Sequence, residues 1–318
     1  MENRLLKAIE FIPLVVIGVP GNIFILVKFA FVRILEKKLL PTNLILMVLA
    51  SVNLIVLVSR VIPLYLYSVG LEEILNDALC KLTVFTYRVC RALSISFTSL
   101  LSCHQCILIA PSNRHWSYLK QKVSRHMLII IMIVIIINFL LYPSSFLYAH
   151  EKNNSTSSPY TLYLVTCRTD FLTYVSFVVN GLLLVVKDFI LVGLMTLASS
   201  YIVNVLFHHG KTVKGIRSSD SAEGKSVEYK ASRAVILLVV LYVVLFGLDN
   251  SLWLYTLFNS EPDLNDARIV LSCSYSALSP IVIITTNPKL QCKPKLSQSR
   301  LQSNTQKEDR EGKLNSIS

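Results

Sequence analysis

The chain has 318 residues, of which 53% are hydrophobic and 16% are charged, and its mean hydropathy is +0.57. A soluble domain of this length carries about a quarter charged residues, so the composition indicates an integral membrane protein. The net charge of +12 would suit a nucleic-acid-binding protein. However, the basic residues lie in short segments between long apolar runs, a pattern typical of cytoplasmic loops beside anionic lipid. We therefore expect membrane lipid, and no nucleic acid, among its partners.

Seven segments are long and apolar enough to cross a membrane, which requires about 20 mainly apolar residues. In chain order, the predicted spans are residues 9–32, 43–67, 80–109, 127–148, 172–207, 233–258 and 267–286. Backbone polar groups in hydrocarbon must be satisfied within each segment, so each span is expected to be helical. The predicted fold class is an all-α bundle of seven transmembrane helices.

The distribution of Lys and Arg predicts the orientation of this bundle. The loops after the first, third and fifth spans and the C-terminal segment together carry twenty of these residues, against six on the other side. We therefore expect a short extracellular N-terminus (1–8), a membrane domain (9–286) and a cytoplasmic tail (287–318). The tail is polar and is expected to be disordered.

Two features of the expected outer side agree with this orientation. Asn153 and Asn154 each begin a glycosylation sequon in the second outer loop. Cys80 starts the third span on the outer side, and Cys167 ends the same loop. An oxidising compartment permits a disulfide between these cysteines, and two free thiols are the alternative if the geometry is unsuitable.

The sequence contains none of the motifs that indicate catalysis. It has no H-E-x-x-H, no G-x-S-x-G, no Walker A motif and no Cys/His spacing typical of zinc. We therefore expect neither enzymatic activity nor a metal or cofactor.

An ionisable side chain inside a membrane helix costs roughly 2.5–3.5 kcal/mol on insertion scales and usually has a function or a partner. Six charged residues of the predicted spans are candidates for such a role. They are Arg60, Arg88, Arg91, Lys187, Asp188 and Asp249. Most fall in the outer half of the bundle, and the basic residues are in excess. A partly buried site of this kind favours a ligand carboxylate, sulfate or phosphate. Tyr87 is a further candidate for the lining of such a pocket.

An internal ion-pair network is an equally good explanation of these charges. Arg88 and Arg91 are three residues apart and share one helix face, so Asp188 and Asp249 could serve as their partners. Lys187 and Asp188 are adjacent in the sequence and are not expected to face each other. The two interpretations are compatible, because a paired arginine can also contact a ligand.

Short motifs in several spans together resemble one family. They are GVPGN (18–22), PTNLIL (41–46), LVSRVIP (57–63), CKL (80–82), YRVCRALSI (87–95), LLSCHQC (100–106), IAPSNRHW (109–116), KD (187–188), VGLM (192–195) and LSPIV (278–282). On these residues, the chain resembles vomeronasal type-1 receptors and their fish relatives, the class A-like olfactory receptors. These are rhodopsin-like G-protein-coupled receptors, and the resemblance extends over roughly residues 18–288.

The resemblance implies a pheromone or odorant receptor in the plasma membrane of chemosensory neurons. It also implies a small-molecule ligand, an inhibitory-type heterotrimeric G protein, the Cys80–Cys167 disulfide and glycosylation of the second outer loop. His104 and Gln105 stand where most rhodopsin-like receptors have Asp and Arg. With Arg114, they are the candidates for contact with the G protein.

Two alternative functions fit a protein with several spans. A bitter-taste receptor also lacks the usual Asp-Arg-Tyr triplet, but Cys80, Cys167 and the LSPIV segment favour the vomeronasal group. A small transporter would be expected to show inverted repeats or broken helices, and no such pairing is visible in the sequence.

Overall fold

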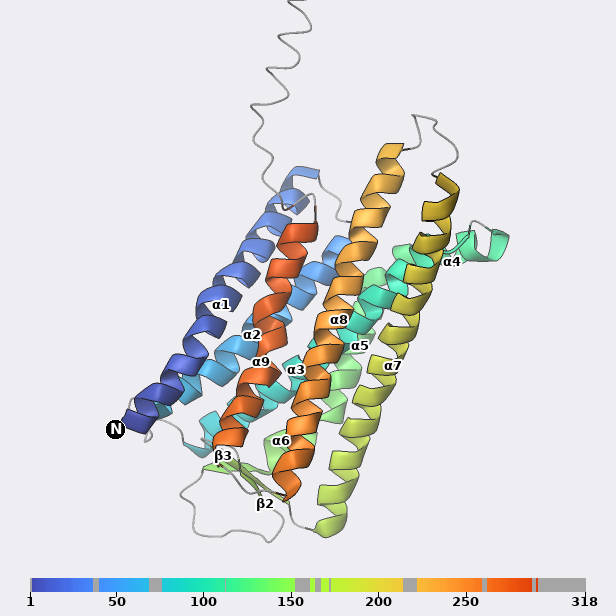
Figure 1. Ribbon diagram of the computed structural model, residues 1–318. Helices are drawn as coiled ribbons and strands as arrows, with labels where there is room; N and C mark the ends of the chain where they lie inside the picture. The colour runs from blue at the N-terminus through green and yellow to red at the C-terminus, as the bar shows by residue number, and fades with distance from the viewer. Residues whose placement is uncertain are drawn as a thin grey trace, which may run out of the picture.

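The chain forms an elongated bundle of helices with a small sheet at one end (Figure 1). The computed structural model describes residues 2–36, 40–68, 76–111, 113–151, 161–163, 167–171, 173–213, 222–258, 262–287 and 290. Both predicted glycosylation sites, Asn153 and Asn154, and nearly all of the predicted tail lie outside these residues. We call the end that carries the sheet the sheet end, and the other the opposite end.

The described residues form nine helices. They are α1 (Glu2–Glu36), α2 (Pro41–Ser68), α3 (Asp77–Ile109), α4 (Arg114–Arg125), α5 (Met127–Leu141), α6 (Pro143–Leu147), α7 (Tyr174–Val213), α8 (Ala222–Phe258) and α9 (Pro262–Thr286). The long helices extend beyond the predicted spans at one or both ends. For example, α1 begins at Glu2, within the predicted N-terminal segment. A helix forms its hydrogen bonds within its own backbone, so it does not have to end where the apolar segment ends.

Six of these helices, α1, α2, α3, α7, α8 and α9, are each long and apolar enough to cross a membrane. The pair α4 and α5 meets the same test only together, and it is bent by 67°, so the bundle has up to seven spans. The prediction of an all-α transmembrane bundle is therefore confirmed in its class, and the fourth span differs from the prediction.

The predicted fourth span, 127–148, is divided at Tyr142. Helix α5 ends at Leu141, and the short α6 starts with Pro143. Proline has no backbone N–H and is favoured in the first position of a helix, so it separates two helices here. The 15 residues of α5 rise about 22 Å, less than the roughly 30 Å of hydrocarbon in a bilayer. Helix α6 therefore extends the path of α5.

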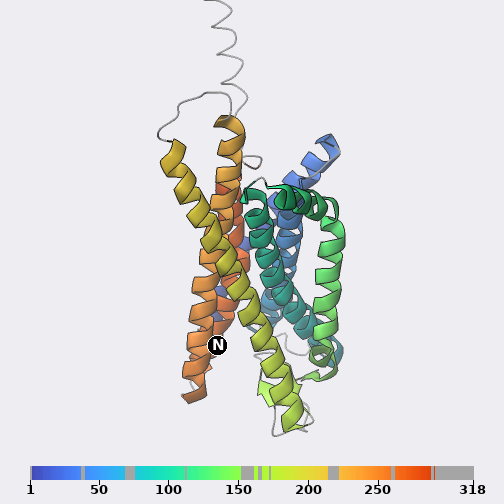
Figure 2. The same ribbon diagram turned by 90° about the vertical axis from the view of Figure 1, so that its right-hand side faces the viewer.

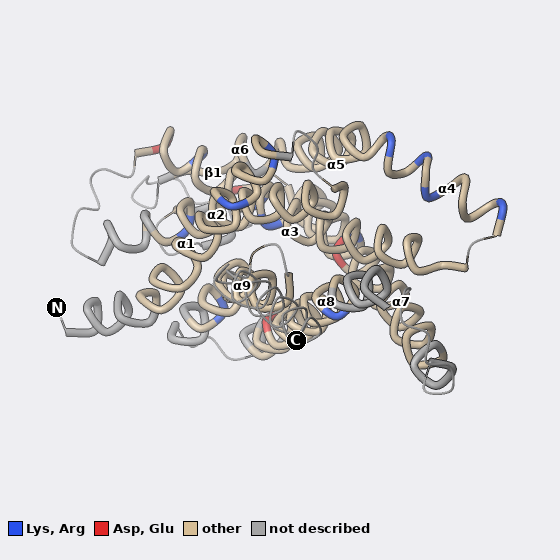
Figure 3. The backbone as a smooth tube through the Cα atoms, turned by 90° about the horizontal axis from the view of Figure 1, so that it is seen from above, with Lys and Arg blue, Asp and Glu red and all other residues tan. Residues whose placement is uncertain are grey.

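Residues 114–125, which we predicted as a loop, form the helix α4. Figure 2 shows α4 lying across the opposite end of the bundle, next to the start of α5. None of its residues is fully buried, and Figure 3 shows basic residues spaced along it. Apolar and basic residues alternate here with a helical rather than a random spacing, and a helix of this kind suits a membrane surface.

A three-stranded antiparallel sheet covers the sheet end. Its strands are β1 (Ala149–Glu151), β2 (Thr161–Tyr163) and β3 (Cys167–Asp170), in the order β1-β3-β2. The central strand carries Cys167, which forms a disulfide with Cys80 of α3. These cysteines, with Val84 and Ala149, form a small buried cluster. The sheet, which the sequence analysis treated as loop, is thus fastened to the start of α3.

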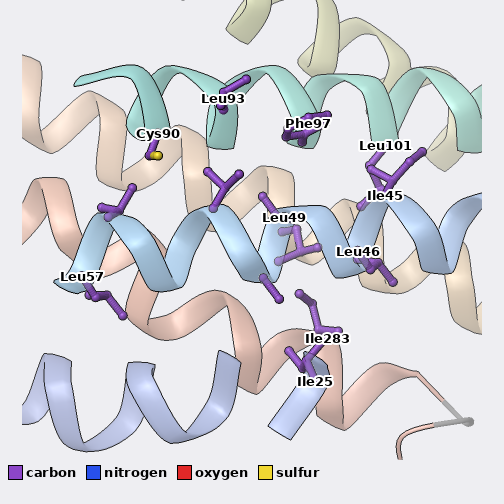
Figure 4. Close-up of a cluster of buried hydrophobic side chains, with 14 of the residues drawn as sticks. Ile25, Ile45, Leu46, Leu49, Leu57, Cys90, Leu93, Phe97, Leu101 and Ile283 are labelled. Carbon is purple, nitrogen blue, oxygen red and sulfur yellow. The ribbon is translucent and has the colours of Figure 1, made fainter. Parts of the chain in front are cut away.

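Helix α3 lies at the centre of the bundle and packs against α2, α5, α6, α7 and α8. The main core joins it to α1, α2 and α9; Figure 4 shows Leu49, Phe97 and Ile283 among its side chains. By contrast, α7 exposes apolar residues along its length, including Leu182 and Leu197. Lipid is the expected neighbour of such a surface, because apolar side chains on a membrane helix need no protein partner.

Candidate functional site

Three charged side chains from three helices meet at Asp249. The Nη2 atom of Arg91, on α3, donates to Oδ2 of Asp249, on α8, over 2.7 Å. The Nε atom of Arg268, on α9, lies 3.9 Å from Oδ1 of the same carboxylate. The side chain of Asp249 is 11% exposed, so this carboxylate depends on the two arginines for its charge balance. We call these three residues the Asp249 site.

A cavity adjoins the Asp249 site between α3, α8 and α9. Its lining consists of Arg91, Ser94, Tyr242, Leu245, Phe246, Asp249, Leu271, Ser272, Tyr275 and Ser276. On α9, Leu271 and Ser272 are followed four residues later by Tyr275 and Ser276, so all four share one helix face. The cavity has a volume of about 20 Å³, which is close to the space that one water molecule occupies. A ligand larger than water does not fit this space in the present arrangement of the side chains.

Tyrosines form much of the wall around this cavity. The rings of Tyr242 and Tyr275 meet edge to face with centroids 5.0 Å apart, and the hydroxyl of Tyr275 is hydrogen-bonded to Thr98 over 2.7 Å. Tyr242 lies in the electrostatic field of Arg91, Asp188 and Asp249. Aromatic walls with a few polar anchors are typical of small-molecule sites.

Tyr87 is connected to the cavity through one of its lining residues. Its hydroxyl donates to Oγ of Ser272 over 2.9 Å, and the guanidinium of Arg60 lies 4.9 Å from the centre of its ring. A cation over an aromatic face is stabilised by the ring quadrupole, which accounts for Arg60 inside a membrane helix. Tyr87 thus joins α2, α3 and α9 beside the site.

Lys187 and Asp188 form a second polar cluster with Tyr142. The Nζ atom of Lys187 donates to the Tyr142 hydroxyl over 2.9 Å and lies 3.2 Å from Oδ1 of Asp188. Our expectation that these neighbours do not face each other is wrong. Lysine has a long flexible side chain, and its ammonium reaches the adjacent carboxylate although the two Cβ atoms point apart. Arg88 lies within electrostatic reach of Tyr142, Arg60 and Tyr87.

The structure therefore divides the predicted ligand-binding residues into groups. Arg91 and Asp249 line the cavity, Tyr87 borders it through Ser272, and Lys187 and Asp188 belong to the Tyr142 cluster. The sequence analysis missed Arg268, because it lies next to the predicted start of the seventh span and was counted as a loop charge. Its distance of seven residues from Tyr275, two helical turns, would have placed both on one face.

A buried hydroxyl–amide network lies deeper between α2, α3 and α9. The amide nitrogen of Asn53 donates to Oγ of Ser279 over 2.9 Å, and its amide oxygen accepts from Ser94 over 2.6 Å and from Ser276 over 3.3 Å. Because Ser94 and Ser276 also line the cavity, this network connects the cavity floor to the interior of the bundle.

Near the opposite end, the predicted G-protein contacts have different environments. His104 and Gln105 are only 3% and 1% exposed. Nδ1 of His104 lies 3.4 Å from the Thr42 hydroxyl, and the amide of Gln105 donates to Ser232 over 3.1 Å. In this conformation both side chains join helices to one another. Arg114, at the start of α4, is exposed.

Comparison with known proteins identifies the family. The sequence profile of the vomeronasal organ pheromone receptor family matches residues 6–293. The chain belongs to this family. It is 33% identical to olfactory receptor class A-like protein 1 of Danio rerio over 91% of both chains. It is also 27% identical to vomeronasal type-1 receptor 3 of Homo sapiens, over 87% of this chain and 89% of that receptor.

A third relative is vomeronasal type-1 receptor 90 of Rattus norvegicus, with 28% identity over 87% of this chain and 89% of that receptor. Membership of the vomeronasal receptor family makes this protein a chemosensory G-protein-coupled receptor that crosses the plasma membrane several times. It also decides against an enzyme, a bitter-taste receptor and a small transporter.

Proposed function

We propose that this vomeronasal-family receptor responds to small anionic molecules that bind between α3, α8 and α9. The observation that carries the proposal is the charge of the Asp249 site, where two arginines share one carboxylate. Arg60 and Arg88 add positive charge nearby. Partly buried guanidinium groups in excess of carboxylates favour an anion, because Arg binds carboxylates with paired, charge-assisted hydrogen bonds.

Ligand binding in this proposal selects a more open arrangement of the helices. The cavity beside Arg91 has room for about one water, so a ligand binds better to a conformation in which α3, α8 and α9 lie further apart. A ligand with different affinities for two conformations shifts their populations. Helices α3 and α8 also meet near the opposite end, where Gln105 donates to Ser232. A separation of these helices would therefore also change their contact at that end.

The partner at the opposite end is proposed to be an inhibitory-type heterotrimeric G protein. Arg114, Lys122 and Arg125 of α4 are exposed and would contact the G protein and anionic lipid. His104 and Gln105 would act from inside the bundle, by holding α3 against α2 and α8 until the helices move. The positive charge of the loops at this end supports a cytoplasmic position.

The sheet end is accordingly proposed to face the outside of a chemosensory neuron. The N-terminus, the Cys80–Cys167 disulfide and the sequons at Asn153 and Asn154 would then all lie on the extracellular side. The residues of the predicted tail, 287–318, would lie in the cytoplasm. Disulfides form in the secretory pathway and persist outside the cell, which supports this orientation.

A second-messenger screen tests the proposed ligand class. The receptor is co-expressed with an inhibitory-type or a promiscuous G-protein α subunit and exposed to small carboxylates, their primary amides and the corresponding amines. We expect responses to the carboxylates and none to the amides or amines of the same shape. A response to amines alone would contradict the proposal and would leave the arginines with a purely structural role.

A further inference from the structure

The two arginines of the Asp249 site bind the shared carboxylate unequally. Arg91 donates a hydrogen bond of 2.7 Å to Oδ2, whereas Nε of Arg268 is 3.9 Å from Oδ1, too far for a hydrogen bond. That Nε atom is buried and has no hydrogen-bond partner within the described part of the chain. A guanidinium has five N–H donors. Arg268 therefore has an unused donor close to Asp249, whose carboxylate is hydrogen-bonded to Arg91 instead.

Only one of the two arginines lines the cavity. Arg91 belongs to its wall, and Arg268 does not. Arg268 lies one helical turn before Ser272 on the cavity-facing side of α9, roughly 6 Å along the helix axis. A ligand in the cavity would therefore contact Arg91. Arg268 lies near the carboxylate of Asp249 instead, on the side of the sheet end.

We propose that Asp249 is a switch that exchanges partners, from Arg91 in the resting receptor to Arg268 when a ligand carboxylate binds Arg91. This inference rests on the proposed anionic ligand and specifies how that ligand acts. The exchange keeps the charges balanced, because two guanidinium groups then face two carboxylates. Without Arg268, the displaced Asp249 would be a buried and unpaired charge, which is strongly unfavourable.

The exchange also explains how binding would affect the helices. In this structure the bond between Arg91 and Asp249 joins α3 to α8. Moving Asp249 to Arg268 would replace that link with one between α8 and α9, which already pack against each other. Helices α3 and α8 would then be free to separate, as the small cavity requires. Arg268 is thus a positioning residue, which acts on the ligand through Asp249.

A double-mutant cycle tests this role with the full-length receptor and a carboxylate that activates the wild type. Arg268→Gln is expected to lower the potency of the carboxylate about tenfold or more, the effect of one lost charged hydrogen bond. Asp249→Asn removes the internal competitor and is expected to raise potency by a similar factor. In the Asp249→Asn background, Arg268→Gln should lower the potency only slightly, because no carboxylate at position 249 remains to pair with Arg268.

The cycle separates this role from direct contact between Arg268 and the ligand. If Arg268→Gln lowers potency equally in both backgrounds, Arg268 binds the ligand itself and the exchange is contradicted. Lys81→Gln is the matched control for loss of a positive charge near the sheet end, and it should leave potency close to that of the wild type. Should Asp249→Asn not reach the surface, Arg268→Lys is compared with Arg268→Gln, and equal losses in both would contradict the exchange.

Basal signalling decides the inference even if no carboxylate activates the wild type. That result would contradict the proposed ligand class and the proposed trigger of the exchange, but not the resting link between Arg91 and Asp249 that the exchange requires. Asp249→Asn breaks the link between α3 and α8 and is expected to raise signalling in the absence of any ligand. Basal signalling equal to that of the wild type, at matched surface expression, would overturn the exchange.

Discussion

Individual charged residues explain much of the unusual composition of the membrane helices. Arg91 is balanced by Asp249, Arg60 lies over the ring of Tyr87, and Lys187 is held by Tyr142 and Asp188. Each pairing lowers the cost of a charge in hydrocarbon. These pairs fit the interpretation as an internal network, and the ligand site stays a compatible prediction, since the paired residues Arg91 and Asp249 also line a cavity.

Replacement of Arg91 by alanine tests its role at the residue scale. Arg91→Ala is expected to abolish the response to carboxylates, because the anion loses its charged donor. It also leaves Asp249 with Arg268 alone, so surface expression is measured alongside the dose–response curve. Arg33→Ala, an exposed arginine far from the cavity, is the control. Unchanged potency in Arg91→Ala at normal surface expression would refute the site.

Asn53 is the residue whose loss should weaken the interior most directly. Asn53→Ala removes the partner of three buried serine hydroxyls, and an unsatisfied buried polar group costs about 1–3 kcal/mol. We expect a lower apparent melting temperature for the detergent-solubilised receptor. Asn180→Ala is the control, because the amide of Asn180 donates to Ser176 of its own helix and joins no second helix in the described part of the chain. Equal melting temperatures for both variants would contradict this account.

At the scale of elements, α1 lies very close to α2 and α9 at Gly18. A Cβ atom on Gly18 would lie 2.6 Å from Cδ1 of Leu57 and 2.8 Å from Cα of Ala277. The amide of Asn22, one turn later, donates to the carbonyls of Gly18 and Ser276. Small residues allow such close approach of membrane helices, which gives the GVPGN motif a packing role.

Substitution of Gly18 tests this contact. Gly18→Ala is expected to lower the melting temperature, since overpacking costs about 1–3 kcal/mol and exceeds the roughly 1 kcal/mol that alanine gains over glycine in a helix. Gly181→Ala is the matched control, because its Cβ would meet nothing within 4 Å, and it should leave stability equal or slightly higher. A lower melting temperature for Gly181→Ala, with an unchanged melting temperature for Gly18→Ala, would contradict the packing role of Gly18.

For the whole molecule, the orientation in the membrane determines which end meets the ligand and which meets the G protein. If the sheet end faces outward, Asn153 or Asn154 receives glycan in the secretory pathway. We expect a glycosidase-sensitive mass shift that disappears when both are replaced by Gln. A C-terminal epitope tag, accessible only after cells are permeabilised, is the second measurement. A tag accessible on intact cells would place the opposite end outside.

The sequence by itself determined the class of this protein and the approximate position of its membrane helices. Apolar length, charge distribution and the motifs in several spans are local or additive properties, and no knowledge of packing is needed to read them. The same holds for the candidate arginines, since a charge in an apolar segment is conspicuous in one dimension.

Only the tertiary structure decided which of those charges meet. Arg91, Asp249 and Arg268 come from three helices far apart in the sequence, and the 2.7 Å and 3.9 Å contacts between them depend on how α3, α8 and α9 are rotated and tilted. The break at Pro143, the helix α4 and the three-stranded sheet were likewise not predicted. They depend on local backbone chemistry and on the Cys80–Cys167 disulfide. Hydropathy detects neither, because it averages over many residues and contains no information about neighbours in space.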